Sequence, residues 1–106
     1  MSDKPNWDDD FAQNLIGATV LVGLRIIGAD SSEEMEQFYG VVTVAVEDHG
    51  ITLELSGSRG GETWLMPPDL RAFEPASPGE YRLRSTQEVV INPDYISQWT
   101  MDKPNN

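Results

Sequence analysis

The chain has 106 residues, enough for one compact domain with a single core. It carries 18 acidic residues against seven lysines and arginines, a net charge of −11, and it contains no cysteine. The missing cysteine excludes disulfides, thiol nucleophiles and zinc–thiolate sites. A negative field of this size repels phosphate backbones and anionic lipids and attracts basic partners.

No run approaches the roughly 20 apolar residues that span a bilayer, and the first residues lack the apolar segment of a secretory signal. We therefore expect a cytoplasmic protein that does not enter membranes. The expected organisation is a single domain over residues 1–106, with its core at about 9–100 and flexible tails at 1–7 and 101–106.

The first predicted element is a short helix in NWDDDFAQNLIG. Asp8 can cap its free amides, Asp9 and Asp10 suit its positive end, and Gly17 can close it. The following segment, ATVLVGLRIIGAD, alternates as a strand does, with one apolar side made of Val20, Val22, Leu24 and Ile26. The polar, acidic segment ADSSEEMEQ then reads as a long connection with room for one helical turn.

A hairpin is predicted in YGVVTVAVEDHGITLEL. We expect His49 and Gly50 to form a two-residue turn in which the glycine supplies a positive φ. In that register Asp48 faces Ile51, and one buried face collects the apolar residues Val44, Val46, Leu53 and Leu55.

A third strand is predicted in ETWLMP, after the glycine-rich link GSRGG. If Ser56 lies opposite Glu62, Trp64 points outward and forms an exposed apolar patch near Tyr39, which usually marks an interaction site. A glycine bulge in the link reverses this and buries the tryptophan. We favour burial of Trp64, because large aromatic side chains are mostly buried.

The remaining chain predicts a crossing segment, two short strands and a final helix. The prolines of PPDLRAFEPASPG exclude a central strand, so we expect a crossing anchored by Leu70 and Phe73. EYRLRS and EVVI read as short strands. NPDYISQW reads as a helix capped by Asn92, on which Tyr95, Ile96 and Trp99 seal one end of the fold.

These elements predict a mainly β fold: a small, strongly bent antiparallel barrel of five to six strands with short N- and C-terminal helical turns. FYGVVTVAVEDHGITLEL resembles the glycine-then-hairpin core of SH3-like and Sm-like barrels. LMPPDLRAFEPASPGEYRLRS, which leads into GEYRLRSTQEVVINPDY, is similar to segments of small uncharacterised bacterial proteins of that architecture. The resemblance implies the fold over about residues 15–100. It does not carry over RNA binding, because the hairpin tip is Asp48-His49 where Sm-like proteins have an Asp/Asn pair.

No catalytic or metal-binding set is visible, so we expect neither an enzyme nor a cofactor. His49, the only histidine, sits at a turn tip, where an exposed structural role is the simpler interpretation. The runs DDD and EEMEQ lack the spacing of a calcium loop. Ser56 and Ser58 do not stand in a nucleophile elbow, and GSRGG lacks the lysine and helix of a phosphate loop. For the arginines of the second half we expect pairing with nearby carboxylates.

We therefore expect a non-catalytic acidic module that binds a basic protein surface. One specific form is an immunity-type inhibitor whose acidic face occupies the basic active site of a partner such as a nuclease. The alternatives are a nucleic-acid-binding barrel, against which the charge argues, and edge-to-edge self-assembly, which leaves the oligomeric state open. The candidate partner surface consists of Glu33, Glu34, Glu36, Tyr39, Glu47, Glu54 and Trp64.

Overall fold

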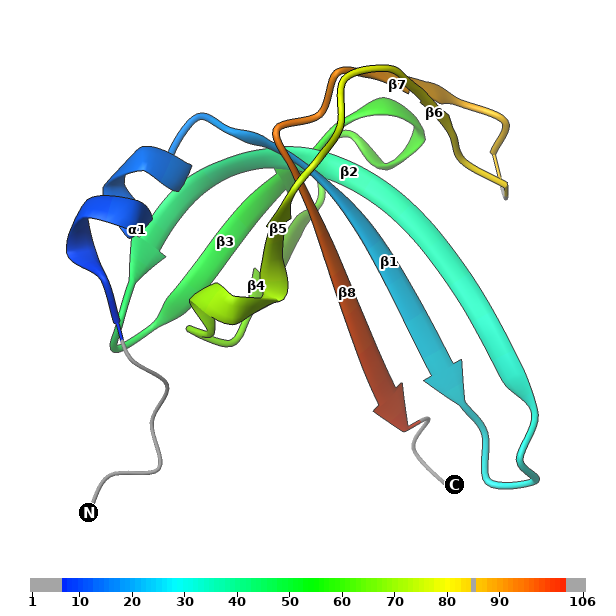
Figure 1. The fold of residues 1–106 in the computed structure, drawn as a ribbon. Helices are drawn as coiled ribbons and strands as arrows, with labels where there is room; N and C mark the ends of the chain where they lie inside the picture. The colour runs from blue at the N-terminus through cyan, green and yellow to red at the C-terminus, as the bar shows by residue number, and fades with distance from the viewer. Residues whose placement is uncertain (1–6, 85, 103–106) are drawn as a thin grey trace.

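The computed structural model describes residues 7–84 and 86–102, and it is mainly β (Figure 1). A six-stranded sheet has the order β4-β3-β2-β1-β8-β5, and a separate two-stranded sheet pairs β6 with β7. In chain order the elements are α1 (Asp9–Leu15), β1 (Thr19–Ile27), β2 (Glu33–Val46), β3 (Gly50–Leu55), η1 (Gly57–Arg59), β4 (Thr63–Met66), η2 (Leu70–Ala72), β5 (Phe73–Pro75), β6 (Glu80–Arg82), β7 (Val89–Ile91) and β8 (Tyr95–Asp102), where η denotes a 3₁₀ turn.

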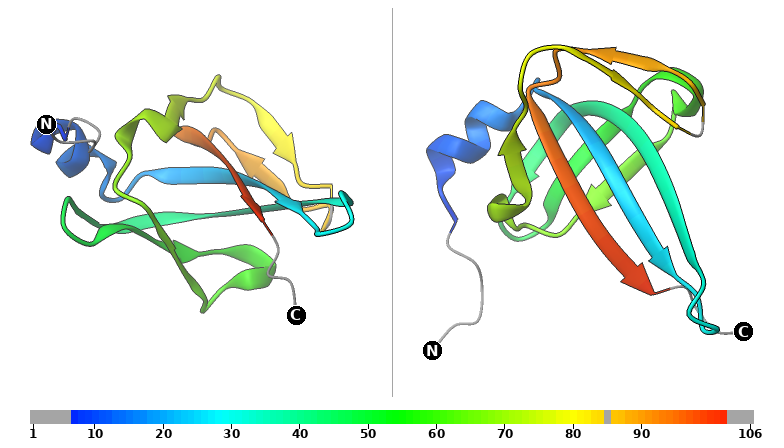
Figure 2. Two further views of the ribbon diagram at one scale, coloured as in Figure 1. Left: turned by 90° about the horizontal axis from the view of Figure 1, so that it is seen from below. Right: turned by 45° about the vertical axis from the view of Figure 1, so that its right-hand side comes forward.

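The large sheet bends strongly but is not closed into a barrel (Figure 2). Its edge strands, β4 and β5, do not pair with each other, and β5 pairs with β8 over three residues only. The expected antiparallel barrel of five to six strands is therefore wrong in two respects. The sheet is open, and β1 and β8 run parallel, so that it is mixed. The mainly β class and the short N-terminal helix are confirmed.

The main core lies on the concave side of the bent sheet. Strand β1 contributes Val20, Val22 and Leu24, which are at most 6% exposed, as the alternation in the sequence predicts. Ile26 continues the same face but is only half-buried. The rest of this core comes from α1, β2, β3, β4, η2 and β5, with the buried side chains Ala12, Leu15, Phe38, Val42, Ala45, Ile51, Leu53, Leu55, Met66, Leu70 and Phe73.

A second, smaller core lies on the convex side, under the β6–β7 hairpin seen at the top of Figure 1. Leu83 and Val90 from this hairpin pack on Leu21 of β1, and all three are buried. Tyr39 and Ile96 flank Leu21 on β2 and β8 and pack against the same cluster. The hairpin therefore covers one end of strands β2, β1 and β8 and does not extend over their other end.

The N-terminal helix forms as its caps predict. The Asp8 carboxylate accepts a hydrogen bond from the Phe11 amide (3.1 Å), and Gly17 follows the helix with a φ of +90°. Ala12 and Leu15 bury the inner face, while Phe11 meets Tyr95 edge to face. The helix thereby covers the end of the core at which β1 and β8 begin.

The β2–β3 hairpin exists, but its predicted register is wrong. Three residues, Glu47 to His49, form the loop, and Val46 pairs directly with Gly50, whose φ is +102°. A register shift between Val42 and Val44 then compensates for the odd loop length. As a result Val44 and Val46 are both 41% exposed, whereas Val42, Ala45 and Ile51 join Leu53 and Leu55 in the core.

The acidic segment expected to be a connection is the first part of strand β2. Residues from Glu33 to Gln37 pair with β1 through Ile27 to Gly23. Most of their side chains are exposed on both faces, so the alternating apolar pattern that reveals a half-buried strand is missing there. The long 14-residue strand β2 is therefore a consequence of pairing with β1 rather than of its own composition.

The predicted C-terminal helix is wrong, because Tyr95 to Asp102 forms strand β8. Asn92 has a φ of +49° and its side chain accepts a hydrogen bond from the Gly79 amide (2.8 Å), so it shapes a turn rather than capping a helix. Met101 and Asp102 belong to the strand and not to a tail. The other residues assigned to tails lie outside the described part of the chain, except Trp7, which packs against the core.

The crossing segment matches its prediction. Leu70 and Phe73 are 8% and 6% exposed and anchor it to the core. The Asp69 side chain caps η2 by accepting a hydrogen bond from the Arg71 amide (3.0 Å). Strand β5 follows immediately and carries the chain along the first residues of β8.

Candidate functional site

The open end of the large sheet is formed by the second halves of β1 and β8 and the first half of β2, which project at the lower right of Figure 1. On the outer edge of β8, pairing with β5 stops at Ser97. From Gln98 to Asp102 that edge has no neighbouring strand among the described residues. We call this part of the molecule the open end.

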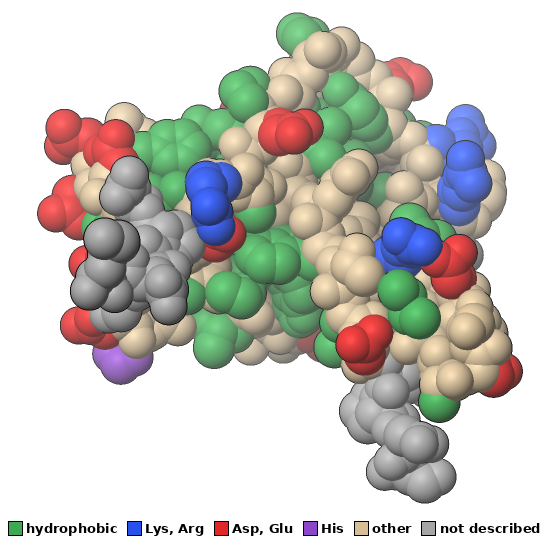
Figure 3. All heavy atoms as spheres, turned by 60° about the horizontal axis from the view of Figure 1, so that its bottom comes forward, with side chains coloured by type: hydrophobic (Ala, Val, Ile, Leu, Met, Phe, Trp, Pro, Cys, Tyr) green, Lys and Arg blue, Asp and Glu red, His purple; other side chains and the backbone are tan. Residues whose placement is uncertain are grey.

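A groove runs along the open end between β4 and β8, on the concave face. Its volume is about 280 Å³. In Figure 3 hydrophobic side chains gather near the middle of the face that is turned forward, with acidic side chains toward its edges. We call the groove between β4 and β8 the tryptophan groove. Its lining is mostly apolar and consists of Leu24, Trp64, Leu65, Pro67, Trp99, Thr100 and Met101.

The two tryptophans of the groove are held in fixed positions. Trp64 makes edge-to-face contacts with Phe38 (centroids 5.1 Å apart) and with Trp99 (6.4 Å). The Trp99 indole N–H donates to the Ser97 hydroxyl (2.8 Å), and Ser97 is fully buried. The polar atom of Trp99 is thus satisfied inside the protein, which leaves its ring as an apolar wall.

Two apolar residues of the groove are strongly exposed. Leu65 on β4 is 61% exposed and Met101 on β8 is 47% exposed. Met101 shares the concave face with Trp99, whereas Leu65 pairs with Thr52 on the outer face of β4 and lies at the rim of the groove. An exposed apolar side chain beside aromatic rings is typical of a binding surface.

Acidic residues share the concave face with the groove. Strand pairing places Glu36 beside Leu24 and Glu34 beside Ile26, on the apolar side of β1. Arg59 lies over the Phe38 ring (4.6 Å) and forms ion pairs with Glu36 (3.8 Å) and Glu62 (3.0 Å). The hydrogen bond from Arg59 lowers the pKa of Glu62 below its ordinary value, so this carboxylate stays charged.

The residues predicted to form one partner surface are spread over several faces. Glu33 lies on the convex side and pairs with Arg25, and Tyr39 packs under the β6–β7 hairpin. Glu54 is on the outer side of β3, and Glu47 is in the distant hairpin loop with His49. Trp64 points inward, the orientation favoured for it. Only three of the seven share the concave face: Glu34, Glu36 and Trp64.

Three residues of the groove were missed by the sequence reasoning, namely Leu65, Trp99 and Met101. Trp99 was hidden by the wrong assignment of a helix to NPDYISQW, and Met101 by its assignment to a C-terminal tail. The alternation of Tyr95, Ser97, Trp99 and Met101 was the signal that could have found them, because a period of two indicates a strand.

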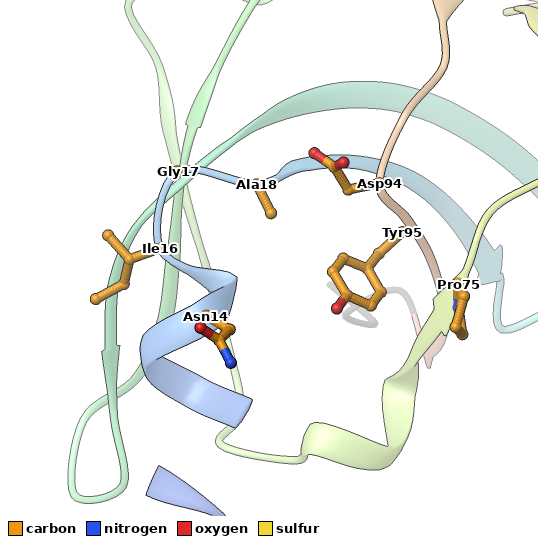
Figure 4. Close-up of a pocket in the computed structure, with 7 residues that line it drawn as sticks. All are labelled: Asn14, Ile16, Gly17, Ala18, Pro75, Asp94 and Tyr95. Carbon is orange, nitrogen blue, oxygen red and sulfur yellow. The ribbon is translucent and has the colours of Figure 1, made fainter. Parts of the chain in front are cut away.

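A second pocket lies between α1, β5 and the start of β8 (Figure 4). Its volume is about 400 Å³, and its polar groups come from Asn14, Asp94 and Tyr95. The Asp94 carboxylate accepts a hydrogen bond from the Thr19 amide (2.9 Å), and the Tyr95 ring contacts both Phe11 and Phe73. These contacts tie β1, β8 and the helix together, so we assign this pocket a structural role.

A third hollow lies on the convex side of the open end, where Gly23 has no side chain. It has a volume of about 420 Å³ and is bordered by Arg25, Met35, Gln37 and Gln98. The Gln37 side chain accepts a hydrogen bond from the Arg84 amide (2.8 Å), and Arg25 is paired with Glu33. Two of its polar side chains, Gln37 and Arg25, are thus engaged within the protein.

Within residues 7–84 and 86–102, no group of three or more His, Asp or Glu side chains is placed to hold a metal ion. In the same part of the chain no helix has the length and apolar character needed to cross a membrane. Arg71 pairs with Asp69 (2.9 Å), and this hydrogen bond lowers the pKa of Asp69.

Comparisons of this chain with protein-family models, with curated proteins and with solved structures find no match.

Proposed function

We propose that this protein is a non-catalytic binding module whose tryptophan groove holds a basic segment of another protein. The observation that carries the proposal is the groove itself. Two fixed tryptophans and the exposed side chain of Met101 line a concave channel at the open end of the sheet, and Leu65 lies at its rim. Buried aromatic anchors surrounded by polar residues are the usual source of binding energy at protein interfaces.

Charge supports a basic partner. The chain has a net charge of −11, and Glu34 and Glu36 stand on the same face as the groove. A field of this sign speeds encounter with positively charged proteins and disfavours acidic ones.

Two narrower ideas from the sequence stay predictions. One is the inhibitor form, in which the acidic surface occupies the basic active site of a partner enzyme. The other is kinship with SH3-like and Sm-like barrels. The binding proposal depends on neither of them, because it rests on the groove and the charge of this chain.

Selection from a library of random peptides displayed on phage tests the proposal. We expect peptides selected on the wild-type protein to be rich in lysine or arginine and in apolar residues. Their binding should fall at least about tenfold on Met101→Lys, which places a charge in the groove and repels a basic peptide.

Ile91→Lys is the matched control, because Ile91 is an exposed apolar residue of β7, in the hairpin that covers the other end of the strands. It makes the same change of charge and should leave binding within about twofold, since only the location of the charge differs. Absence of enrichment, enrichment of acidic peptides, or equal loss on the two variants would contradict the proposal. Binding of single-stranded RNA in a gel shift at low salt would favour a nucleic-acid partner instead.

A further inference from the structure

The free edge of β8 adjoins the tryptophan groove. Strand β5 occupies this edge only as far as Ser97, so the edge is unpaired over residues 98–102. An unpaired strand edge presents a row of main-chain donors and acceptors to any extended chain. At the open end this row therefore lies beside an apolar channel.

The direction of the main-chain groups on this edge follows from the pairing. The Ala76 amide donates to the Asp94 carbonyl (3.1 Å), on the β5 side of the strand. Backbone groups alternate along a strand, so the N–H and C=O of Ile96, Gln98 and Thr100 point to the β5 side, as the Asp94 carbonyl does. Those of Ile96 meet β5. Those of Gln98 and Thr100 lie past its end, where η2 borders Gln98 and Thr100 is farther out.

Side chains alternate in step with these groups. By strand alternation, Trp99 and Met101 lie on the concave side with Leu24 and Ile26, while Gln98 and Thr100 lie on the convex side with Gly23 and Arg25. A strand added along this edge would direct every second side chain toward the tryptophans. The other side chains would lie on the convex face.

The charges near the convex side of this edge favour basic side chains. Strand pairing places Glu74, opposite Ile96, and Asp102, opposite Ile27, in the convex row at the two ends of the free edge. The two nearby arginines are already engaged, Arg71 with Asp69 and Arg25 with Glu33. A second copy of this chain is a poor occupant, because each copy carries a charge of −11.

From these observations we propose that the partner binds by strand addition. An extended basic segment continues the line of β5 along residues 98–102 of β8, antiparallel to it, with apolar side chains in the tryptophan groove and lysines or arginines on the convex side. This mode rests on the proposed function, since it specifies how the groove takes its partner.

A pair of modified peptides tests the mode without changing the protein. The probe is a fluorescein-labelled peptide in which four lysines alternate with three valines, and its binding is followed by fluorescence anisotropy at low salt. In strand addition the lysine amides face Gln98 and Thr100, and the valine amides face solvent. N-methylation of the two central lysines should therefore weaken binding at least about tenfold, while N-methylation of two valines should change it by less than about twofold.

A matched pair of variants makes the same test from the protein side. Thr100→Pro removes the N–H of the free edge and leaves the side chains of the groove in place, whereas Thr100→Val keeps the N–H. We expect the peptide to bind the valine variant normally and the proline variant at least about tenfold more weakly. Unchanged tryptophan fluorescence and cooperative unfolding show that each variant is folded.

The outcomes separate the two proposals. Equal binding of both N-methylated peptides, together with weaker binding to Met101→Lys, overturns strand addition and retains the groove as a binding site. No binding of the unmodified peptide, or equal binding of a peptide that alternates glutamate with valine, overturns both. A concentration-dependent dimer of the free protein in sedimentation, lost in Thr100→Pro, would assign the edge to a second copy instead.

Discussion

Strands β1, β2 and β8 run through two regions with opposite character. In the covered half, around Leu21 and Val22, both faces of the sheet are buried, one under the β6–β7 hairpin and one in the main core. In the open end the convex face carries Gly23 and Arg25, and among residues 7–84 and 86–102 no second hairpin packs over them. The concave face of the open end is also apolar, and the side chain that packs over it is mainly Trp64.

The difference separates the part of the strands that supplies stability from the part that we propose to bind a partner. Burial on both faces supplies the stability that fixes the strands, because burying apolar side chains is the main favourable term in folding. The same rigid strands then hold Trp99 and Met101 beyond the covered half. A binding surface built on such a scaffold needs little ordering when a partner arrives, which reduces the cost of association.

The largest effect is expected in the covered half. Leu53 is fully buried at the centre of the concave core. Replacing it with alanine should lower the free energy of unfolding by about 2–5 kcal/mol, since it removes buried methyl groups and leaves a cavity. Urea denaturation measures this directly. A loss of less than about 1 kcal/mol would mean that the main core does not carry the stability assigned to it.

A smaller loss is expected from the convex cluster. Leu83 is 1% exposed and anchors the β6–β7 hairpin on Leu21, and in the described part of the chain this cluster has three buried members. Leu83→Ala should cost about 2–3 kcal/mol, near the lower end of the range for such substitutions. If thermal unfolding of this variant matches the wild type, the hairpin does not contribute to the covered half as described.

The open end should tolerate substitution with almost no loss of stability. Met101→Lys and Met35→Lys change exposed side chains and should shift the free energy of unfolding by no more than about 0.5 kcal/mol. Chemical denaturation of both variants checks this. A loss above about 2 kcal/mol for Met101→Lys would show that the groove belongs to the core and is not a free surface.

The smallest expected effect is a dependence of folding stability on pH, and it arises from Glu88 at the border of the covered half. Glu88 accepts hydrogen bonds from the hydroxyls of Thr86 and Ser58 (both 2.9 Å), and these bonds lower its pKa from the ordinary 4.5. A carboxylate with a lowered pKa stabilises the folded state above its unfolded pKa, and this stabilisation is lost as the pH falls through the folded value.

The difference in melting temperature between the wild type and Glu88→Gln should therefore shrink as the pH falls from neutrality to below 4.5. Differential scanning calorimetry over this range makes the comparison. A difference that is constant with pH would show that the charge of Glu88 plays no part in joining the hairpin to η1.

The covered half was largely predictable from the sequence and the open end was not. The alternation of Val20, Val22 and Leu24 and the caps of α1 identified their elements, because each pattern reports burial on one side. At the open end, Glu33 to Gln37 form a strand whose side chains are mostly exposed, so local pattern carries no signal there.

Two errors came from local signals that have more than one structural meaning. The dipeptide His49-Gly50 suggested a two-residue turn, but the glycine closes a three-residue loop, and a shift near Thr43 corrects the register. Asn92 and Pro93 resemble the start of a helix, yet long-range pairing with β1 makes the following residues a strand. Tertiary pairing decided both cases, and it is not visible in a short window of sequence.

Amide hydrogen exchange is the most direct test of the account. With the peptide of alternating lysine and valine bound, exchange followed by NMR should slow at the amides of Gln98 and Thr100, which point to the free edge of β8. The amides of the distant hairpin loop, Glu47 to His49, should be unchanged. Protection confined to that loop, or unchanged exchange at both edge amides in the saturated complex, would contradict the claim that the open end binds a partner by strand addition.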